Sequence, residues 1–391
     1  MDPSTFVEWL HEAMQGSDRA DRRHIIRFGT ERDFALFTRL LGKGGPAISR
    51  SGFYPVQPLH NIRAISVPLR SPAKLASLPF VHSIEPDIRI RVHHALPRKR
   101  SVTQNAGIVK QAPRIPWGIK HIRAPLAWRK SQGDRIRIGV IDTGADYSHP
   151  DLRHCLSRGV NVLNRQLLPI DDNGHGTHIA GTIAAFTLQK GIIGVAPQAI
   201  IHPVKAFDHQ GGAFVSDIIS GIDWCVRNGV DIINMSFGMK TYSKALEDAV
   251  LNAYREGVII VASSGNEGKQ ADVDYPARFK QVIAVGATTR KGRIAPFSNS
   301  GKKIDIYAPG EKIVSTWLRG QYHELSGTSM ATSHVSGVIA LMLARRPDLR
   351  PRQVKTILSR HARMILKPGK RMGGAKEIHA LRAVSAVMAK S

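Results

Sequence analysis

Three short segments of the sequence supply an acid, an imidazole and a hydroxyl, the groups that together activate a serine. They read Asp-Thr-Gly from Asp142, His-Gly-Thr-His from His175 and Gly-Thr-Ser-Met-Ala around Ser329. A serine hydroxyl becomes a strong nucleophile when a histidine removes its proton, and a carboxylate fixes the tautomer of that histidine. The segments therefore predict a catalytic triad of Asp142, His175 and Ser329.

Each segment alone has another interpretation. Asp-Thr-Gly is also the aspartic-protease tripeptide, but that chemistry needs two facing carboxylates and no second such tripeptide occurs. His175 and His178 could bind a metal, yet their spacing is not His-x-x-x-His and no acid lies between them. The glycine-rich helix start before Ser329 could hold a phosphate, but the P-loop pattern is missing. Taken together, the three segments favour the triad.

The elements around these segments indicate how the three groups are brought together. From residue 135 onward, short apolar runs alternate with helical patterns, and Asp142 directly follows the first run. Near-continuous apolar strands separated by helices predict an α/β domain with a doubly wound, mostly parallel sheet, whose sites lie at the carboxyl ends of the strands. The expected strands span residues 136–141, 231–235, 258–262 and 282–285, with helical patterns over 215–226 and 246–254.

A smaller unit precedes this domain. Residues 24–93 alternate strand-like and helix-like segments in the order β-α-β-β-α-β, which predicts a small ferredoxin-like α+β domain whose last strand spans 88–92. The predicted organisation is an N-terminal extension at 1–23, the α+β domain at 24–93, an exposed linker at 94–115 and the α/β domain at 116–391.

The composition narrows the classes of function. Lysine and arginine number 56 against 30 acidic residues, a formal net charge of +26 that favours acidic partners. The charges are dispersed and no nucleic-acid-binding motif accompanies them, so we do not expect nucleic acid as a main partner. The N-terminus lacks an apolar signal core, which suggests the cytoplasm, and the longest apolar stretch, 335–344, is too short to span a bilayer.

From about residue 115 to residue 363 the chain resembles the subtilisin family of serine proteases. The order Asp, His, Ser is the subtilisin order. The matching stretches include Ile141-Asp142-Thr143-Gly144, His149-Pro150-Asp151-Leu152, Gly194-Val195-Ala196-Pro197, Ser264-Gly265-Asn266-Glu267-Gly268 and Tyr275-Pro276-Ala277. The resemblance implies a serine endopeptidase that cleaves protein substrates through an acyl-enzyme and needs no cofactor for its chemistry. A catalytically silent scaffold and a nucleic-acid-associated protein of the same fold are the alternatives.

The resemblance also implies further site residues. Asn266 matches the family's oxyanion asparagine, whose amide would donate to the developing oxyanion beside the backbone N–H of Ser329. Asp274 falls where the family borders its specificity pocket; a carboxylate there would favour Lys or Arg before the scissile bond, and a solvated loop acid is the alternative. The two segments expected to line that pocket are Ser236-Phe237-Gly238 and Ser263-Ser264-Gly265.

The segment 24–93 resembles the family's propeptide, which assists folding and then blocks the cleft. We therefore expect a precursor that cuts itself between about Val92 and Ile115, in the linker. If the pocket prefers cations, Arg100 or Lys110 is the expected residue before the cut. The freed N-terminal domain would then inhibit the enzyme, which we expect to be a monomer.

Two departures from the family pattern have expected consequences. Ser333 stands where the family usually has a proline, which should alter local stability and leave the chemistry intact. Asp151 matches an aspartate of the family's calcium site, but Pro113 and Leu188 stand where a glutamine and an asparagine would complete it. Calcium prefers six to eight oxygen ligands, so calcium binding here is doubtful.

Overall fold

A nine-stranded sheet forms the centre of the larger domain, in the order β17-β18-β14-β13-β12-β10-β6-β8-β7. The strands are parallel except for the edge pair β17 and β18, which is antiparallel. In sheet order they span Arg363–Met364, Lys376–Glu377, Ile306–Pro309, Ile283–Thr288, Ile259–Ser263, Ile232–Met235, Arg137–Asp142, Ile200–Lys205 and Val160–Asn161. This arrangement confirms the predicted mostly parallel α/β fold.

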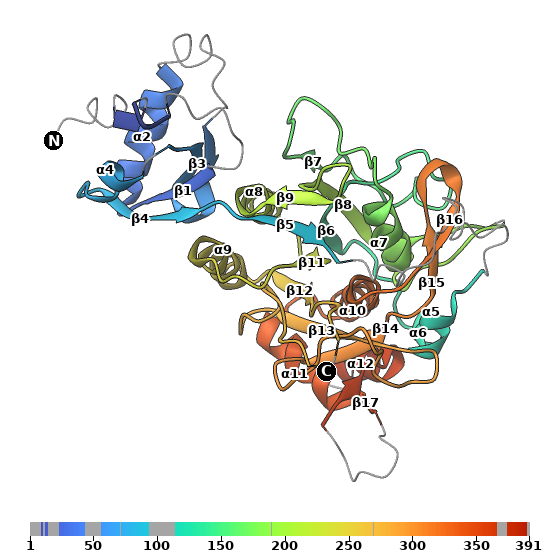
Figure 1. Ribbon diagram of the computed structural model, residues 1–391. Coiled ribbons are helices and arrows are strands. Elements are labelled where there is room, and N and C mark those ends of the chain that lie inside the picture. The colour runs from blue at the N-terminus through green and yellow to red at the C-terminus, as the bar shows by residue number, and fades with distance from the viewer. Residues whose placement is uncertain are drawn as a thin grey trace, which may run out of the picture.

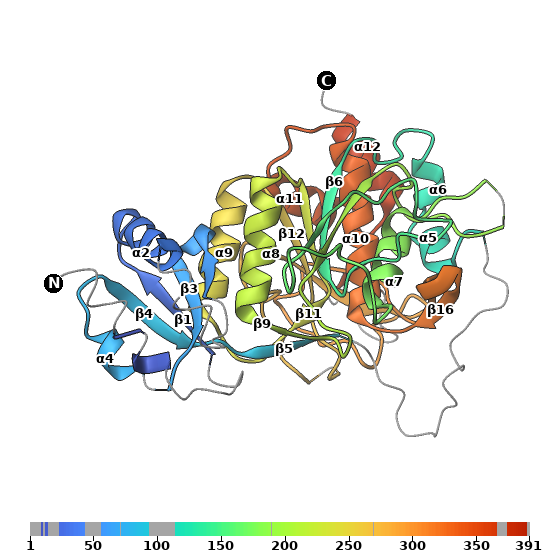
Figure 2. The same cartoon turned by 90° about the horizontal axis from the view of Figure 1, so that it is seen from above.

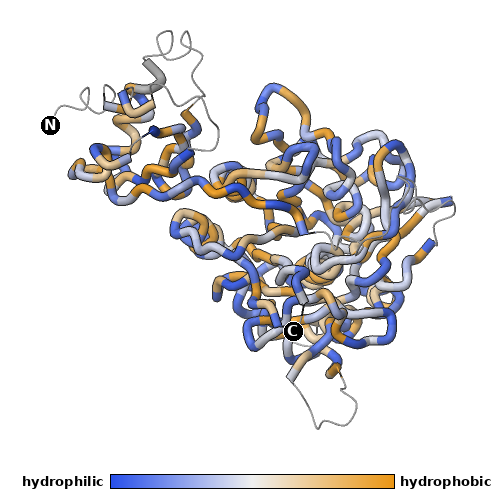
Figure 3. The backbone as a smooth tube through the Cα atoms, in the orientation of Figure 1, coloured by the Kyte–Doolittle hydropathy of each residue, from blue (hydrophilic) through white to orange (hydrophobic). Residues whose placement is uncertain are grey.

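Helices cover both faces of this sheet, as Figures 1 and 2 show. One face packs against α8 (Val215–Arg227) and α9 (Lys244–Arg255), and the other against α7 (His175–Ala184) and α10 (Thr328–Leu343). Because the inner strands β10, β12 and β13 are buried on both sides, their apolar residues run almost without interruption; apolar segments are orange in Figure 3. The remaining helices are α5 (Trp117–His121), α6 (Ala124–Ala127), α11 (Pro351–His361) and α12 (Ala380–Met388).

A separate hairpin of β15 (Ile313–Thr316) and β16 (Tyr322–Leu325) encloses the short helix η3 (Leu318–Gly320). The computed structural model describes residues 9–10, 12–14, 23–43, 56–70, 72–93, 114–188, 190–268, 270–365 and 374–388. Most of the predicted extension and linker, including Arg100, Lys110 and Pro113, lies outside these residues. Within the described residues, no helix combines the length and apolarity needed to cross a bilayer.

The N-terminal domain is a four-stranded antiparallel sheet in the order β2-β3-β1-β4. Its core is aromatic: the rings of Phe28 and Phe37 stack with centroids 5.1 Å apart. The elements are β1 (Arg23–Phe28), α2 (Glu31–Lys43), β2 (Gln57–Leu59), η2 (His60–Ile62), β3 (Ala64–Pro68), α4 (Ala73–Ala76) and β4 (Val81–Pro86).

The strand predicted at 88–92 forms, but the prediction that it belongs to the N-terminal sheet is wrong. Strand β5 (Arg89–Val92) leaves the N-terminal sheet and enters the larger domain, where it is the middle strand between β9 (Gly212–Phe214) and β11 (Phe237–Gly238). Figures 1 and 2 show β5 running from one domain into the other. Its alternating pattern is real, but the buried side chains of Ile90 and Val92 pack into the core of the larger domain.

Candidate active site

Asp142 and His175 meet at the carboxyl end of β6. Asp142 is the last residue of that strand, and His175 is the first residue of α7. Oδ1 of Asp142 accepts hydrogen bonds from Nδ1 of His175 (2.7 Å) and from the backbone N–H of Thr143 (2.8 Å), and both side chains are completely buried. A carboxylate bound to Nδ1 leaves Nε2 as the nitrogen able to accept a proton.

A second buried carboxylate, which the sequence analysis missed, connects these two elements. Oδ1 of Asp171 accepts hydrogen bonds from Oγ1 of Thr143 (2.8 Å) and from the backbone N–H of Gly174 (2.9 Å). Its Oδ2 accepts from the N–H (2.9 Å) and Oγ1 (2.6 Å) of Thr177. Asp171 therefore caps the first turn of α7 and ties it to the loop after Asp142. An aspartate four residues before the first helical residue, His175, is the sequence signal that could have identified this capping role.

His178 is a structural residue rather than a metal ligand. Its Nε2 lies 3.1 Å from the carbonyl oxygens of both Ile313 and His323, so this nitrogen carries the proton and donates. Burial, together with the neighbouring His175, lowers the pKa of His178 to about 3. Among the residues that the structure describes, no three His, Cys, Asp or Glu side chains gather into a metal-binding group.

Ser329 lies in the first turn of α10 and contacts the end of the N-terminal segment. Its Oγ lies 2.8 Å from the carbonyl oxygen of His93 and 2.9 Å from that of Ser236. The backbone N–H of His93 also donates to the Ser236 carbonyl, at 3.2 Å. The peptide group that follows β5 is thus held directly at the hydroxyl of Ser329.

Asn266 is fixed with its amide nitrogen free to donate. Its Oδ1 accepts hydrogen bonds from the backbone N–H and from Oγ1 of Thr328, both at 2.9 Å. The buried Nδ2 has no hydrogen-bond partner among the described residues. A Cβ on Gly327 would come within 3.2 Å of this nitrogen and 3.3 Å of the His93 carbonyl oxygen, so both atoms border the same small space. A donor in this space can stabilise negative charge that develops on the carbonyl oxygen.

The side chain of His93 fills a pocket beside Ser329. Its Nδ1 lies 2.8 Å from Oγ of Ser263 and its Nε2 lies 3.0 Å from Oδ2 of Asp274. Asp274 is only 2% exposed, so it is not a solvated loop acid. Although burial raises the pKa of Asp274, hydrogen bonds from His93 and Lys240 outweigh this effect and hold that pKa below its usual value.

The remaining residues predicted to line the pocket play different structural parts. Gly238 forms a flat wall, because a Cβ there would lie 2.5 Å from Cε1 of His93. The side chain of Phe237 packs in the core against Phe207, with ring centroids 5.0 Å apart. Ser264 is also buried, and its Oγ lies 3.4 Å from the carbonyl oxygen of Asn299. Gly265 follows it and adopts a left-handed φ of 106°.

The residues around Asp151 do not fit a calcium ion. Oδ2 of Asp151 already accepts hydrogen bonds from the hydroxyl of Tyr322 (2.8 Å) and from the backbone N–H of Ile192 (2.9 Å). Leu188, which replaces a liganding side chain, is 81% exposed and has no side-chain oxygen. A calcium ion needs six to eight oxygen ligands, and one carboxylate oxygen is left here. The Tyr322 hydroxyl therefore takes up, by a hydrogen bond, a carboxylate oxygen that a cation would need.

Ser333 does not interrupt α10. The helix is continuous from Thr328 to Leu343, and Oγ of Ser333 donates to the carbonyl oxygen of Ser329 at 2.9 Å. A proline has no hydroxyl and could not donate this hydrogen bond. The serine side chain therefore gives the Ser329 carbonyl oxygen a partner that the family's proline would not.

The structure thus holds an Asp142–His175 pair at the carboxyl end of β6, and Ser329 and Asn266 beside the His93 carbonyl. With the mostly parallel α/β fold, these parts are those of a serine endopeptidase. Comparison with known proteins agrees. The model of the subtilase family matches residues 133–381. The thermostable alkaline protease of Halalkalibacterium halodurans is 38% identical over 307 residues, which cover 78% of this chain and 83% of the relative.

Two further relatives are subtilisins. Subtilisin DY of Bacillus licheniformis is 40% identical over 63% of this chain and 91% of its own length. Subtilisin E of Bacillus subtilis is 41% identical over 62% of this chain and 65% of its own length. The chain belongs to the subtilase family and is a subtilisin-like serine protease that acts on protein substrates.

Proposed function

We propose that Asp142, His175, Ser329 and Asn266 carry out the hydrolysis and that the first bond cut lies in this chain, between His93 and His94. The observation that carries this proposal is the contact of 2.8 Å between Oγ of Ser329 and the carbonyl oxygen of His93. The bond falls inside the interval predicted from the sequence. Its preceding residue is histidine, whereas the sequence analysis favoured Arg100 or Lys110, which lie outside the described residues.

The proposed reaction proceeds in two steps. Oγ of Ser329 attacks the His93 carbonyl carbon while His175 takes its proton, and the amide of Asn266 donates to the oxyanion that forms. His175 then gives the proton to the nitrogen of His94, the C–N bond breaks, and an acyl-enzyme remains on Ser329. A water molecule, deprotonated by His175, attacks the acyl carbon and releases the His93 carboxylate.

Residues before the cut are held as an added strand, which supports a substrate-like orientation. Strand β5 lies antiparallel to both β9 and β11, with Ile90 opposite Ala213 and Arg91 opposite Gly238. Main-chain pairing of this kind binds an extended peptide, and pockets for alternate side chains add selectivity. After the cut the same strand would block the cleft, so we propose that the N-terminal domain inhibits the enzyme.

The N-terminal domain is also docked through two acidic side chains. Asp87 accepts hydrogen bonds from the N–H (2.9 Å) and Oγ (2.6 Å) of Ser216, in the first turn of α8. Glu85 accepts from Oγ of Ser243 (2.5 Å) and from the N–H of Ala245 (3.2 Å), at the start of α9. Carboxylates are favourable at helix N-termini because unpaired N–H groups and the helix dipole face them there.

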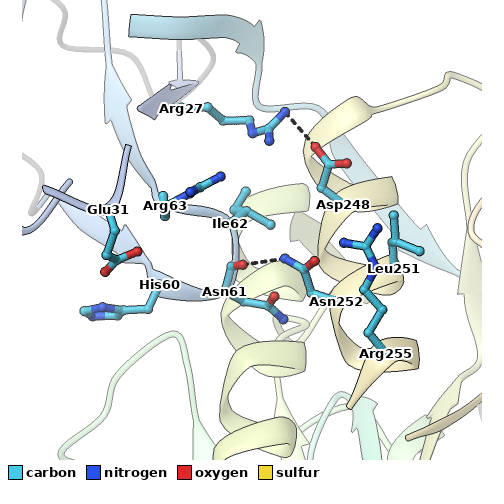
Figure 4. Close-up of a pocket in the computed structure, with 10 residues that line it drawn as sticks. All are labelled: Arg27, Glu31, His60, Asn61, Ile62, Arg63, Asp248, Leu251, Asn252 and Arg255. Atoms are coloured by element: carbon cyan, nitrogen blue, oxygen red, sulfur yellow. Dashed lines mark hydrogen bonds and ion pairs between the residues drawn. The ribbon is translucent and has the colours of Figure 1, made fainter. Parts of the chain in front are cut away.

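A cavity of about 490 Å³ lies between the two domains at one place in their interface, as Figure 4 shows. Its bridging contacts are an ion pair between Arg27 and Asp248 (2.6 Å) and a hydrogen bond from Nδ2 of Asn252 to the carbonyl oxygen of Asn61 (2.7 Å). Apolar side chains of the N-terminal domain are buried in the same interface, since Ile25, Leu59 and Ile62 form one cluster with residues of α8 and α9. The cavity and the polar bridges beside this cluster interrupt the interface, which supports an inhibitor that dissociates after the cut.

The test is N-terminal sequencing of the active species together with mapping of a fluorophosphonate label. The unaltered chain should yield a fragment beginning at His94 and carry the label on Ser329. Ser329→Ala should remain uncut and unlabelled, while Ser333→Ala, which removes a hydroxyl one helical turn away, should be cut and labelled. An active enzyme that keeps its original N-terminus would refute self-processing, and label on another residue would refute the nucleophile.

A further inference from the structure

We propose that the pocket beside Ser329 selects histidine before the scissile bond and that Asp274 is its specificity-determining residue. This inference rests on the proposed function, because it treats His93 as the residue at the reacting carbonyl. It differs from the preference for Lys or Arg expected from the sequence.

Each nitrogen of the His93 ring has its own partner. Nδ1 faces Oγ of Ser263 at 2.8 Å and Nε2 faces Oδ2 of Asp274 at 3.0 Å. The Ser263 hydroxyl has a further acceptor, the carbonyl oxygen of Phe237 at 3.4 Å, so its own proton can point there. It is then free to accept from Nδ1–H. With Asp274 ionised, both partners accept, and the ring that fits best is the doubly protonated imidazolium.

The pocket is also shaped for a flat ring. His93 is only 8% exposed, and Gly238 lies against its Cε1 and Nε2 so closely that a Cβ would be 2.5 and 2.7 Å away. A phenylalanine ring in the same space would leave the buried Asp274 carboxylate and Ser263 hydroxyl without their partners. Sites with buried polar groups discriminate strongly against side chains that cannot pair with them.

Lys240 explains why a short cation should be preferred over a long one. Its Nζ lies 2.5 Å from the other oxygen of Asp274, Oδ1, and 2.8 Å from Oε2 of Glu267. One side of the Asp274 carboxylate is therefore already neutralised at the rim of the pocket. A substrate ammonium or guanidinium reaching past Oδ2 would approach this positive charge, whereas an imidazolium stops at Oδ2.

The experiment compares fluorogenic peptide amides of sequence Ile-Arg-Val-X, which copies Ile90 to Val92, with X as His, Arg, Lys, Phe or Gln. At pH 6 the processed enzyme should prefer His over Phe by about 10-fold or more in kcat/KM. Asp274→Asn should reduce this ratio by about 10-fold to 50-fold. Lys240→Gln should raise the Arg-to-His ratio by about 5-fold.

Asp272→Asn is the matched control, since it removes the same charge two residues away, from a side chain that is 88% exposed. Its His-to-Phe ratio should equal that of the unaltered enzyme. Titration with the fluorophosphonate label counts the competent enzyme, which separates lost selectivity from failed folding. Preference for Phe, or a ratio that Asp274→Asn and Lys240→Gln both leave unchanged, would overturn this inference alone. Absence of label on Ser329 would overturn the proposed function and this inference with it.

Discussion

Two of the regions in which the N-terminal domain contacts the larger domain differ in their chemistry. The docking region consists of Glu85 and Asp87 at the starts of α9 and α8. The cleft region consists of β5 and His93, held by main-chain pairing and by the pocket beside Ser329. The first uses side chains remote from any reaction, and the second presents the bond to be cut. Binding of the inhibitor and its chemistry are thus encoded in separate segments, which variants can alter one at a time.

The largest effect is expected from the cleft region. Ser329→Ala should lower kcat for peptide hydrolysis by about 10⁶-fold, the magnitude measured for loss of the nucleophile in a related subtilisin. The precursor should accumulate uncut while the docking region still holds the two domains together. Peptide turnover and size-exclusion chromatography measure the two consequences. Normal processing of the variant would contradict Ser329 as the nucleophile.

Asn266→Ala should have the next largest effect. Its Nδ2 is the free donor beside the His93 carbonyl oxygen, so its loss should lower kcat by about 10²-fold to 10³-fold with little change in KM; this range is also that measured in a subtilisin. Steady-state kinetics on a peptide amide provide the measurement. A KM effect without a kcat effect would show that the amide binds substrate rather than the transition state.

In the docking region, the combined change Glu85→Gln and Asp87→Asn should weaken inhibition by the cut N-terminal domain about 10-fold to 100-fold. The site of the cut should stay the same, because the cleft region is intact. Recovery of activity on dilution of the processed mixture measures the inhibition. Glu12→Gln, at an exposed pair with Lys74 in the same domain, is the control. Unchanged inhibition would mean that the cleft region alone holds the inhibitor.

The preference of the cleft region for histidine should depend on pH. An imidazole ring donates from both nitrogens only when it is doubly protonated, and free imidazole is mostly so below about pH 6.5. The pKa of Asp274 is lowered, so this carboxylate stays ionised beside Lys240 and Glu267. The ratio of kcat/KM for His over Arg peptides should fall about 5-fold to 10-fold from pH 5.5 to 8. A ratio independent of pH would argue for a neutral ring.

Chelation should have the smallest effect, since neither contact region nor the surroundings of Asp151 needs an ion. A chelator should shift Tm by less than about 2 °C. Differential scanning calorimetry with and without calcium is the measurement. A large fall in Tm that calcium alone restores would show that an ion binds despite the Tyr322 hydrogen bond to Asp151.

The pairing of Asp142 with His175 and the place of Ser329 at the start of a helix could be predicted because each residue lies in a short local pattern. Asp142 ends an apolar strand, and His175 and Ser329 begin helices, so their positions at one edge of the sheet follow from the fold class. The contact between His93 and Asp274 could not be predicted in this way. It depends on β5 pairing with strands more than a hundred residues later, and no local pattern specifies such a partner.

In the fold too, the sequence predicted local elements better than it predicted their distant partners. The apolar runs predicted four strands of the central sheet, β6, β10, β12 and β13, within three residues at either end, since burial on both faces leaves a continuous signal. Strand β4, Val81–Pro86, was missed because its side chains are only partly buried and the pattern is weak. Strand β5 has the clearer alternation and was assigned to the wrong sheet. Glu85 and Asp87 were not singled out, because the helices they cap are distant in the sequence.

The place of β5 between β9 and β11 has a consequence for the choice of later substrates. Once this strand leaves, the gap accepts any segment that can present several residues in extended form with both main-chain edges free. A helix, or a strand already paired on both sides, cannot do so without opening first. The rate at which a folded protein is cleaved should then be proportional to the fraction of time that the cleaved segment is locally unfolded. Cleavage would therefore depend on the conformational stability of the substrate as much as on its sequence.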